Sequence, residues 1–167
     1  MPGFTLINTM AGSLQAMTTT YKSLTRALPA STARRIRVEL LEFSAVSVPS
    51  TTDCQIQADF TYCSAAGAGT ATTSAAAMPL DTGTAIGTAL DVAAATTALN
   101  FTAEPTAFTQ AQCWYNRGFN QRSGVIWEPA PGREIIMPAT TGTGAPMRAL
   151  STNYTGNVVG RITFDEL

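Results

Sequence analysis

The chain has 167 residues, enough for one domain with a real hydrophobic core, and it is unusually poor in charge. Charged residues make up 13% of it, about half the share usual for a soluble domain, whereas the hydrophobic share of 45% is ordinary. The formal net charge is −1, and the nine arginines and one lysine form no basic stripe. A nucleic-acid-binding function is therefore not expected, because it requires several phosphates to be neutralised from one face.

The elements are expected to be β-strands, because threonine is abundant and the good helix formers lysine, glutamate and glutamine are scarce. The N-terminal segment has neither a basic leader nor an uninterrupted apolar run, so no signal peptide is predicted. No stretch approaches the roughly 18 apolar residues of a membrane span. We expect a soluble protein that is made in a reducing cytoplasm.

The N-terminal segment, residues 1–14, is expected to be an arm that lies on a neighbouring subunit. Its Phe4, Leu6 and Ile7 are too apolar for a tail in water. An ordinary edge strand is the alternative interpretation. We predict these three side chains to be the partner-binding residues and residues 15–167 to form the folded domain.

Two segments in the first half of the chain have the clearest period-two pattern. In residues 34–43, apolar and charged side chains alternate until Leu41 and Glu42 break the phase, which predicts a bulge or a strand end. In residues 53–63, Cys54, Ile56 and every second residue onward share one face, which indicates a half-buried strand.

A long segment rich in Ala, Thr and Gly follows, at residues 64–98. One interpretation is a connection across the domain, with a short helix capped by Asp91 and running from Val92 to Leu99. The other is a loop pressed against a partner, since loops of this length are usually functional or disordered and low charge argues against disorder.

The second half of the chain contains shorter strand patterns bounded by turn residues. Strands are predicted over residues 17–27, 111–117, 124–127, 133–137, 145–150 and 158–165, with turns at 128–132 and 140–146. Together with the two earlier segments this gives about eight strands. The predicted fold class is all-β: a single jelly-roll-like β-sandwich with an N-terminal arm and a long Ala/Thr/Gly-rich connection.

Residues able to carry catalysis are scarce. There is no histidine, which removes the commonest general base and metal ligand and every Ser/His or Cys/His nucleophile pair. The acidic residues are scattered, and a carboxylate on the polar face of a strand is more often simply solvated. We therefore expect no enzymatic activity, no cofactor and no metal site.

The three cysteines, Cys54, Cys63 and Cys113, are odd in number and irregularly spaced, which fits neither a disulfide framework nor a zinc site. They are expected to be reduced and structurally passive, with Cys54 buried beside Ile56 and Cys63 on the opposite face. Trp114 and Trp127 could stack on sugar rings, but a core or interface position is the favoured interpretation.

The order of the segments resembles the small jelly-roll decoration, or cement, proteins of tailed bacteriophage capsids. The resemblance lies in RRIRVELLEF, in QIQADFTYC followed by SAAGAGT, in SGVIWEPAPGREIIMPATTGTGAPMRAL, and in the ending TGNVVGRITFDEL. It covers most of the chain through fold-level motifs, and it carries over no catalytic or binding residue.

The resemblance implies a structural virion protein on the outer capsid surface that stabilises contacts between major capsid protein subunits. It implies a homotrimer with no nucleic-acid or membrane partner, assembled in the host cytoplasm. The alternative is a jelly-roll module of a phage tail or fibre that binds a host glycan or receptor. The mixed-sign set Arg34, Arg35, Arg37, Glu39 and Glu42 could pair between subunits across a rotation axis.

Overall fold

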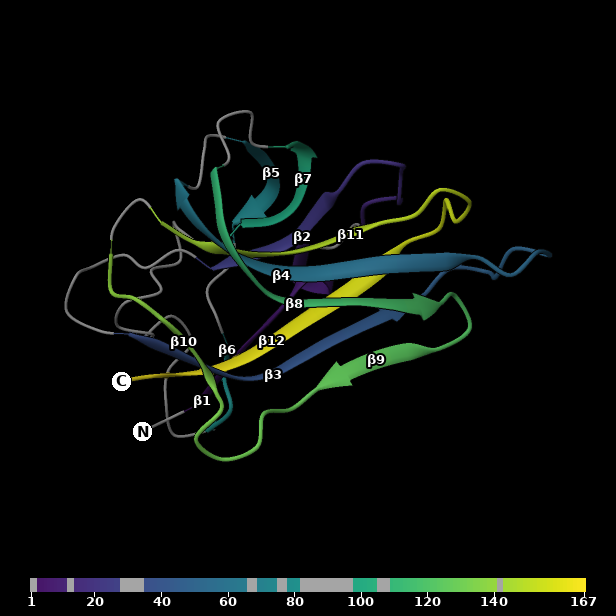
Figure 1. Ribbon diagram of the computed structural model, residues 1–167. Helices are drawn as coiled ribbons and strands as arrows, with labels where there is room; N and C mark the ends of the chain where they lie inside the picture. Colours follow the sequence, from purple (N-terminus) through teal and green to yellow (C-terminus); the bar gives the residue numbers. More distant parts are fainter. Residues whose placement is uncertain are drawn as a thin grey trace.

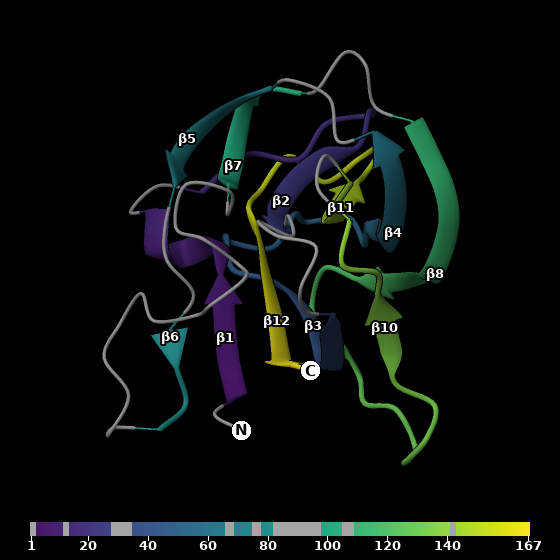
Figure 2. The ribbon, with the colours of Figure 1, turned by 90° about the vertical axis from the view of Figure 1, so that its left-hand side faces the viewer.

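The structure is a computed structural model that describes residues 3–11, 14–27, 35–65, 69–74, 78–81, 98–104, 109–140 and 143–167 (Figure 1). Two β-sheets lie over one another and enclose a hydrophobic core, and every strand pairing is antiparallel. The two sheets form the lower and upper layers of Figure 2. The predicted all-β sandwich is confirmed, while the more specific jelly-roll topology stays a prediction.

The sheet that holds both ends of the chain is called sheet I. Its strands, in spatial order, are β10 (Ile135–Met137), β3 (Ile36–Ala45), β12 (Val158–Glu166), β1 (Gly3–Ile7) and β6 (Met78–Pro79). Strand β9 (Gly124–Trp127) pairs with the other half of β3, so β9 and β10 together form one edge of sheet I.

The second sheet is called sheet II. Its spatial order is β5 (Thr70–Ser74), β7 (Ala98–Ala103), β2 (Lys22–Ala27), β11 (Ala145–Leu150), β4 (Gln55–Ala65) and β8 (Thr109–Asn120). A single turn of 3-10 helix, η1 (Asn8–Ala11), follows β1. Among the described residues it is the only helical element, and none of them forms a helix long and apolar enough to cross a membrane.

The alternating sequence pattern explains the core. In β12 the side chains of Val158, Ile162 and Phe164 point inward, and Gly160 takes the fourth inward position. A Cβ atom on Gly160 would lie 3.1 Å from Leu24 Cδ1 of sheet II, so glycine allows the two sheets to approach closely here.

Two predicted strands depart from simple alternation because of bulges. On β3, Leu40 pairs with Thr163 and Val38 with Phe164, so Glu39 is the bulged residue and the strand continues to Ala45. On β4, register shifts after Phe60 change the phase, and Cys63 is buried, with its Sγ donating a hydrogen bond to the Gly144 carbonyl.

The predicted arm is corrected by the structure. Residues 3–7 form β1 between β12 and β6 of the chain's own sheet, and Phe4 stacks on Phe164 with ring centroids 5.8 Å apart. The side chains of Phe4 and Leu6 are buried in the common core, whereas Ile7 is half-buried. The apolar side chains that suggested contact with a neighbouring subunit pack within the chain itself. Strand β1 therefore belongs to the folded domain.

The N-terminal strand is also held by a buried amide pair. Asn8 donates from Nδ2 to Asn100 Oδ1 and to the Val158 carbonyl, each at 3.0 Å, and its Oδ1 accepts from the Gly160 amide at 3.0 Å. Asn100 in turn donates to the Asn8 carbonyl at 2.9 Å. Because every bond is buried, this pair firmly joins β7 of sheet II to β12 of sheet I and to the start of η1, which directly follows β1.

The strand prediction needs three additions besides β1. All eight predicted strands are present; β5 and β6 lie in the segment expected to be a connection, and β7 begins at its last residue, Ala98. The predicted helix from Val92 to Leu99 is wrong at its end, because Ala98 and Leu99 pair in β7. The rest of that helix lies outside the described residues, as does Arg34.

Candidate functional site on the outer face of sheet II

The outward face of sheet II carries two rows of side chains across β11, β4 and β8. One row is Arg148, Asp59 and Asn116, and the next is Leu150, Gln57 and Gly118. The residues between these rows include Ala58 and Ala149, which are fully buried, so the two rows face away from the core.

The first row contains a buried ion pair. Arg148 donates from Nε to Asp59 Oδ1 at 2.9 Å and from Nη2 to Oδ2 at 2.6 Å, and the two side chains are only 12% and 3% exposed. The ring of Tyr21, just before β2, covers the Arg148 guanidinium at 4.4 Å. This two-point geometry fixes both side chains and neutralises both charges within the chain.

Tyr21 links the ion pair to the rest of the row. Asp59 and the Asn116 side chain both lie near its hydroxyl and influence its pKa. Burial raises the pKa of Asp59, and the bonds from Arg148 oppose that rise. Burial also raises the pKa of Tyr21, and the nearby Asp59 raises it further, so the phenol stays protonated and remains able to donate.

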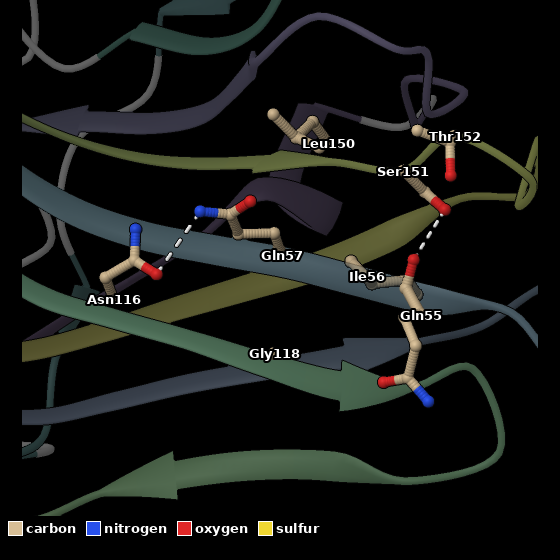
Figure 3. Close-up of a pocket in the computed structure, with 8 residues that line it drawn as sticks. All are labelled: Gln55, Ile56, Gln57, Asn116, Gly118, Leu150, Ser151 and Thr152. Atoms are coloured by element: carbon tan, nitrogen blue, oxygen red, sulfur yellow. Dashed lines mark hydrogen bonds between the residues drawn. The ribbon is translucent and has the colours of Figure 1, made fainter.

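A hollow of about 430 Å³ opens beside this row (Figure 3). Its lining has no charged residue and comprises Gln55, Ile56, Gln57, Asn116, Gly118, Leu150, Ser151 and Thr152. Gln57 Nε2 donates to Asn116 Oδ1 at 3.3 Å, and Ser151 Oγ donates to the Gln55 carbonyl at 2.7 Å. The hollow therefore offers amide and hydroxyl groups beside the aliphatic side chain of Leu150, whereas the side chain of Ile56 is buried in the core. This set is suited to hydrogen bonding and not to proton transfer.

A second surface, here called the sheet I edge, lies on the opposite side of the sandwich. Ile126 of β9 and Ile136 of β10 are 60% and 43% exposed. They pair in register with Glu42 and Arg37 of β3, so they lie on the same outward face as those charges.

The charged side chains of β3 and β12 on the face of Ile126 and Ile136 are paired within the chain. Arg37 Nη2 lies 2.6 Å from Asp165 Oδ2 and 3.0 Å from Glu39 Oε1, and Arg161 Nη2 lies 2.8 Å from Glu42 Oε2. The hydrogen bond to Asp165 raises the pKa of Arg37. Apolar side chains thus lie among charges that already have partners.

The remaining residues singled out in the sequence belong to neither surface. Trp114 packs on Tyr62 and Phe60, with ring centroids 5.3 Å and 5.7 Å apart, and Trp127 packs on Tyr115. Both tryptophans are partly buried against the core, in agreement with the favoured interpretation. Cys54 is buried as expected, and within the described ranges the three cysteines are free and no three His, Cys, Asp or Glu side chains cluster as metal ligands.

Comparisons with known proteins add no relative. No protein-family model, no curated protein and no solved structure matches the chain. The fold defines it as an all-β protein with a two-sheet antiparallel sandwich, and its function is inferred from its surfaces.

Proposed function

We propose that the chain is a structural virion protein, a decoration or cement protein that binds the outer capsid surface and stabilises contacts between major capsid protein subunits. The segment resemblance supports the choice of partner. The sandwich supports the role, since a rigid body held by alternating apolar residues needs no titrating group to act as a clamp. The activity is binding alone, without catalysis.

The observation that carries the proposal is the sheet I edge. Ion pairs made within the chain need no new partner when a neighbouring protein covers them, and the two exposed isoleucines gain free energy from burial. Covering the exposed part of each is worth about 1 kcal/mol. One such contact is weak, but many copies on a shell, each engaging more than one point, bind far more tightly than a single contact.

Self-association as a homotrimer is part of the proposal. Pairing of Arg37, Glu39 and Glu42 across a rotation axis loses support, because all three have partners in the same chain. The trimer therefore rests on the family resemblance and on the low net charge, which does little to keep copies apart.

The test is binding to capsids stripped of the protein, measured by co-sedimentation. Replacing Ile126 and Ile136 with serine should leave the fold intact, because both side chains are exposed, and should weaken binding. Val48→Ser is the matched control, since Val48 is 90% exposed in the β3–β4 connection and lies outside the sheet I edge. Unchanged binding of the double variant, or equal loss in the control, contradicts the proposal.

A second candidate function is a tail or fibre module that binds a host glycan, and the hollow on sheet II favours it. The number of copies in purified particles distinguishes the two. Many copies per capsid support decoration, whereas a few copies that co-purify with tails support the tail module.

A further inference from the structure

We infer that the hollow on sheet II is a binding site for a neutral saccharide. The inference goes beyond the proposed capsid contact, because it concerns the opposite face of the sandwich, and it deepens the second candidate function by naming the ligand class of the hollow. It holds whether or not the sheet I edge binds a capsid, and the two can fail separately.

A glycine of β8, Gly118, lines the hollow. A glycine inside a strand weakens it and usually marks a bulge, a strained backbone or the close approach of another group. Gly118 pairs in regular register with Gln57, and it is not among the described residues with a positive φ angle. A Cβ atom there would meet only the Ile56 carbonyl, at 4.0 Å. Neither the backbone conformation nor the packing within the chain requires glycine at this position. The effect of the glycine is to leave open space where a side chain would otherwise stand.

The side chains that line the hollow match the chemistry of a sugar. The amides of Gln55, Gln57 and Asn116 each carry both donors and acceptors, as does the hydroxyl of Thr152. The Ser151 hydroxyl is buried and already bonds to the Gln55 carbonyl and the Tyr154 amide, so it does not serve as a ligand contact. Sugar hydroxyls also donate and accept, so they match this set. Leu150 adds an aliphatic surface for the C–H face of a sugar ring.

The charge of the surroundings selects a neutral ligand. The lining has no charged side chain, and in the adjacent row Arg148 and Asp59 neutralise each other through two hydrogen bonds. An anionic or cationic ligand would be desolvated here with no counter-ion from the lining.

A peptide fits less well than a saccharide. Peptides commonly bind β-proteins by adding a strand to a sheet edge through main-chain hydrogen bonds. The hollow lies over β4, which pairs on both sides with β11 and β8, so its backbone groups are already used. Side-chain amides on an open face remain, and they favour hydroxyl ligands.

The experiment is a titration of the full ¹⁵N-labelled chain followed by NMR. The probes are glucose, galactose, mannose, N-acetylglucosamine and their homodisaccharides, at about 10 mM, because an open site with few bonds is expected to bind with millimolar affinity. We expect saturable shifts of the side-chain amide signals of Gln55, Gln57 and Asn116 with at least one probe.

Gly118→Val provides the decisive variant. A β-branched side chain suits a strand and has room, so the protein should fold with an unchanged or higher Tm while binding weakens by about tenfold or more. Thr163→Val, on the outward face of sheet I, is the matched control and should bind as the wild type does. Gln57→Leu should also weaken binding, because it removes hydrogen bonds and leaves the space open.

Three results overturn the inference. The first is the absence of shifts with every probe, and the second is binding that persists in folded Gly118→Val. The third is that a library of neutral peptides gives shifts at the same amides, lost in Gly118→Val, while the sugars give none. That last result keeps the hollow as a site but assigns it to peptides.

Discussion

The outer faces of the two sheets use the same device, an arginine held by a carboxylate at 2.6 Å, in different surroundings. On sheet II the pair of Arg148 and Asp59 is nearly inaccessible to water. On sheet I, Arg37 and Arg161 remain 35% and 39% exposed. Buried charges are costly when one partner is removed, whereas exposed pairs contribute little. Because of this difference in burial, we expect the Arg148–Asp59 pair to stabilise the fold and the exposed pairs of sheet I to contribute little to stability.

The comparison also shows how a chain with few charges presents two neutral surfaces. On both faces these arginines, Arg148 on sheet II and Arg37 and Arg161 on sheet I, are paired with carboxylates of the same chain. What remains for a partner differs: exposed isoleucines on sheet I, and amides around an open hollow on sheet II. The first suits a protein partner and the second a hydrogen-bonding ligand.

The largest expected effect is on the sheet II pair. Asp59→Ala leaves the Arg148 guanidinium buried without its carboxylate and should destabilise the fold by about 3–5 kcal/mol in denaturant unfolding. The double variant Asp59→Leu, Arg148→Met should recover most of this loss, because it removes both charges and keeps the volume. A single variant as stable as the wild type would show that the pair is not structural.

A second large effect tests whether β1 belongs to the core of sheet I. Leu6 is fully buried, so Leu6→Ala should destabilise the isolated chain by about 2–5 kcal/mol. Ile7→Ala, on the half-buried neighbouring position, is the matched control and should cost less. Weakened self-association with unchanged unfolding would restore the arm that the sequence suggested.

On the exposed face the ion pairs should matter little to stability. Arg161→Met removes the partner of Glu42, and because both side chains are partly exposed the expected loss is about 0.2–1 kcal/mol. Thermal unfolding at low and high salt measures it, since added salt should shrink the difference from wild type. A loss as large as that of Asp59→Ala would remove the contrast between the two faces.

The smallest effect concerns pH. Burial, and then the neighbouring Asp165, raise the pKa of Glu39. The folded state thus favours the protonated form, and the stability that Glu39 contributes is present below its unfolded pKa and lost as pH rises through the folded pKa. Glu39→Gln should therefore be more stable than wild type near neutral pH, by a few tenths of a kcal/mol for so exposed a group.

This gain should vanish below about pH 4, where glutamate is protonated in both folded and unfolded states. Unfolding curves across that range measure the trend. A gain that grows as the pH falls would contradict the assigned direction of the shift.

The sequence predicted the strands well where alternation was clean, as in β12, because period two reports which face is buried. It failed where burial came from long-range pairing. Phe4 and Leu6 indicate that the N-terminal segment must be buried, but the sequence does not say against which chain. Only the pairing of β1 with β12 shows that the chain's own sheet buries it.

The candidate site was less accessible to sequence reasoning. Asp59 and Arg148 are 89 positions apart and meet only through the register of β4 and β11. Gly118 directly follows the strand predicted over 111–117, so the sequence indicated only a strand end there. The glycine lies within β8, and its meaning depends on the empty space around its Cβ position. The bulge of β3, by contrast, lies at Glu39, close to the break in phase at Leu41 and Glu42 from which the sequence predicted a bulge or a strand end.

The most direct test of the central claim is a cryo-EM map of the intact particle in which the chain is assembled. The account predicts the sandwich on the outer capsid surface, with β9 and β10 facing the major capsid protein and Ile126 and Ile136 buried in the contact. Density for the chain only in the tail, or on the capsid with the sheet I edge facing solvent, would contradict it.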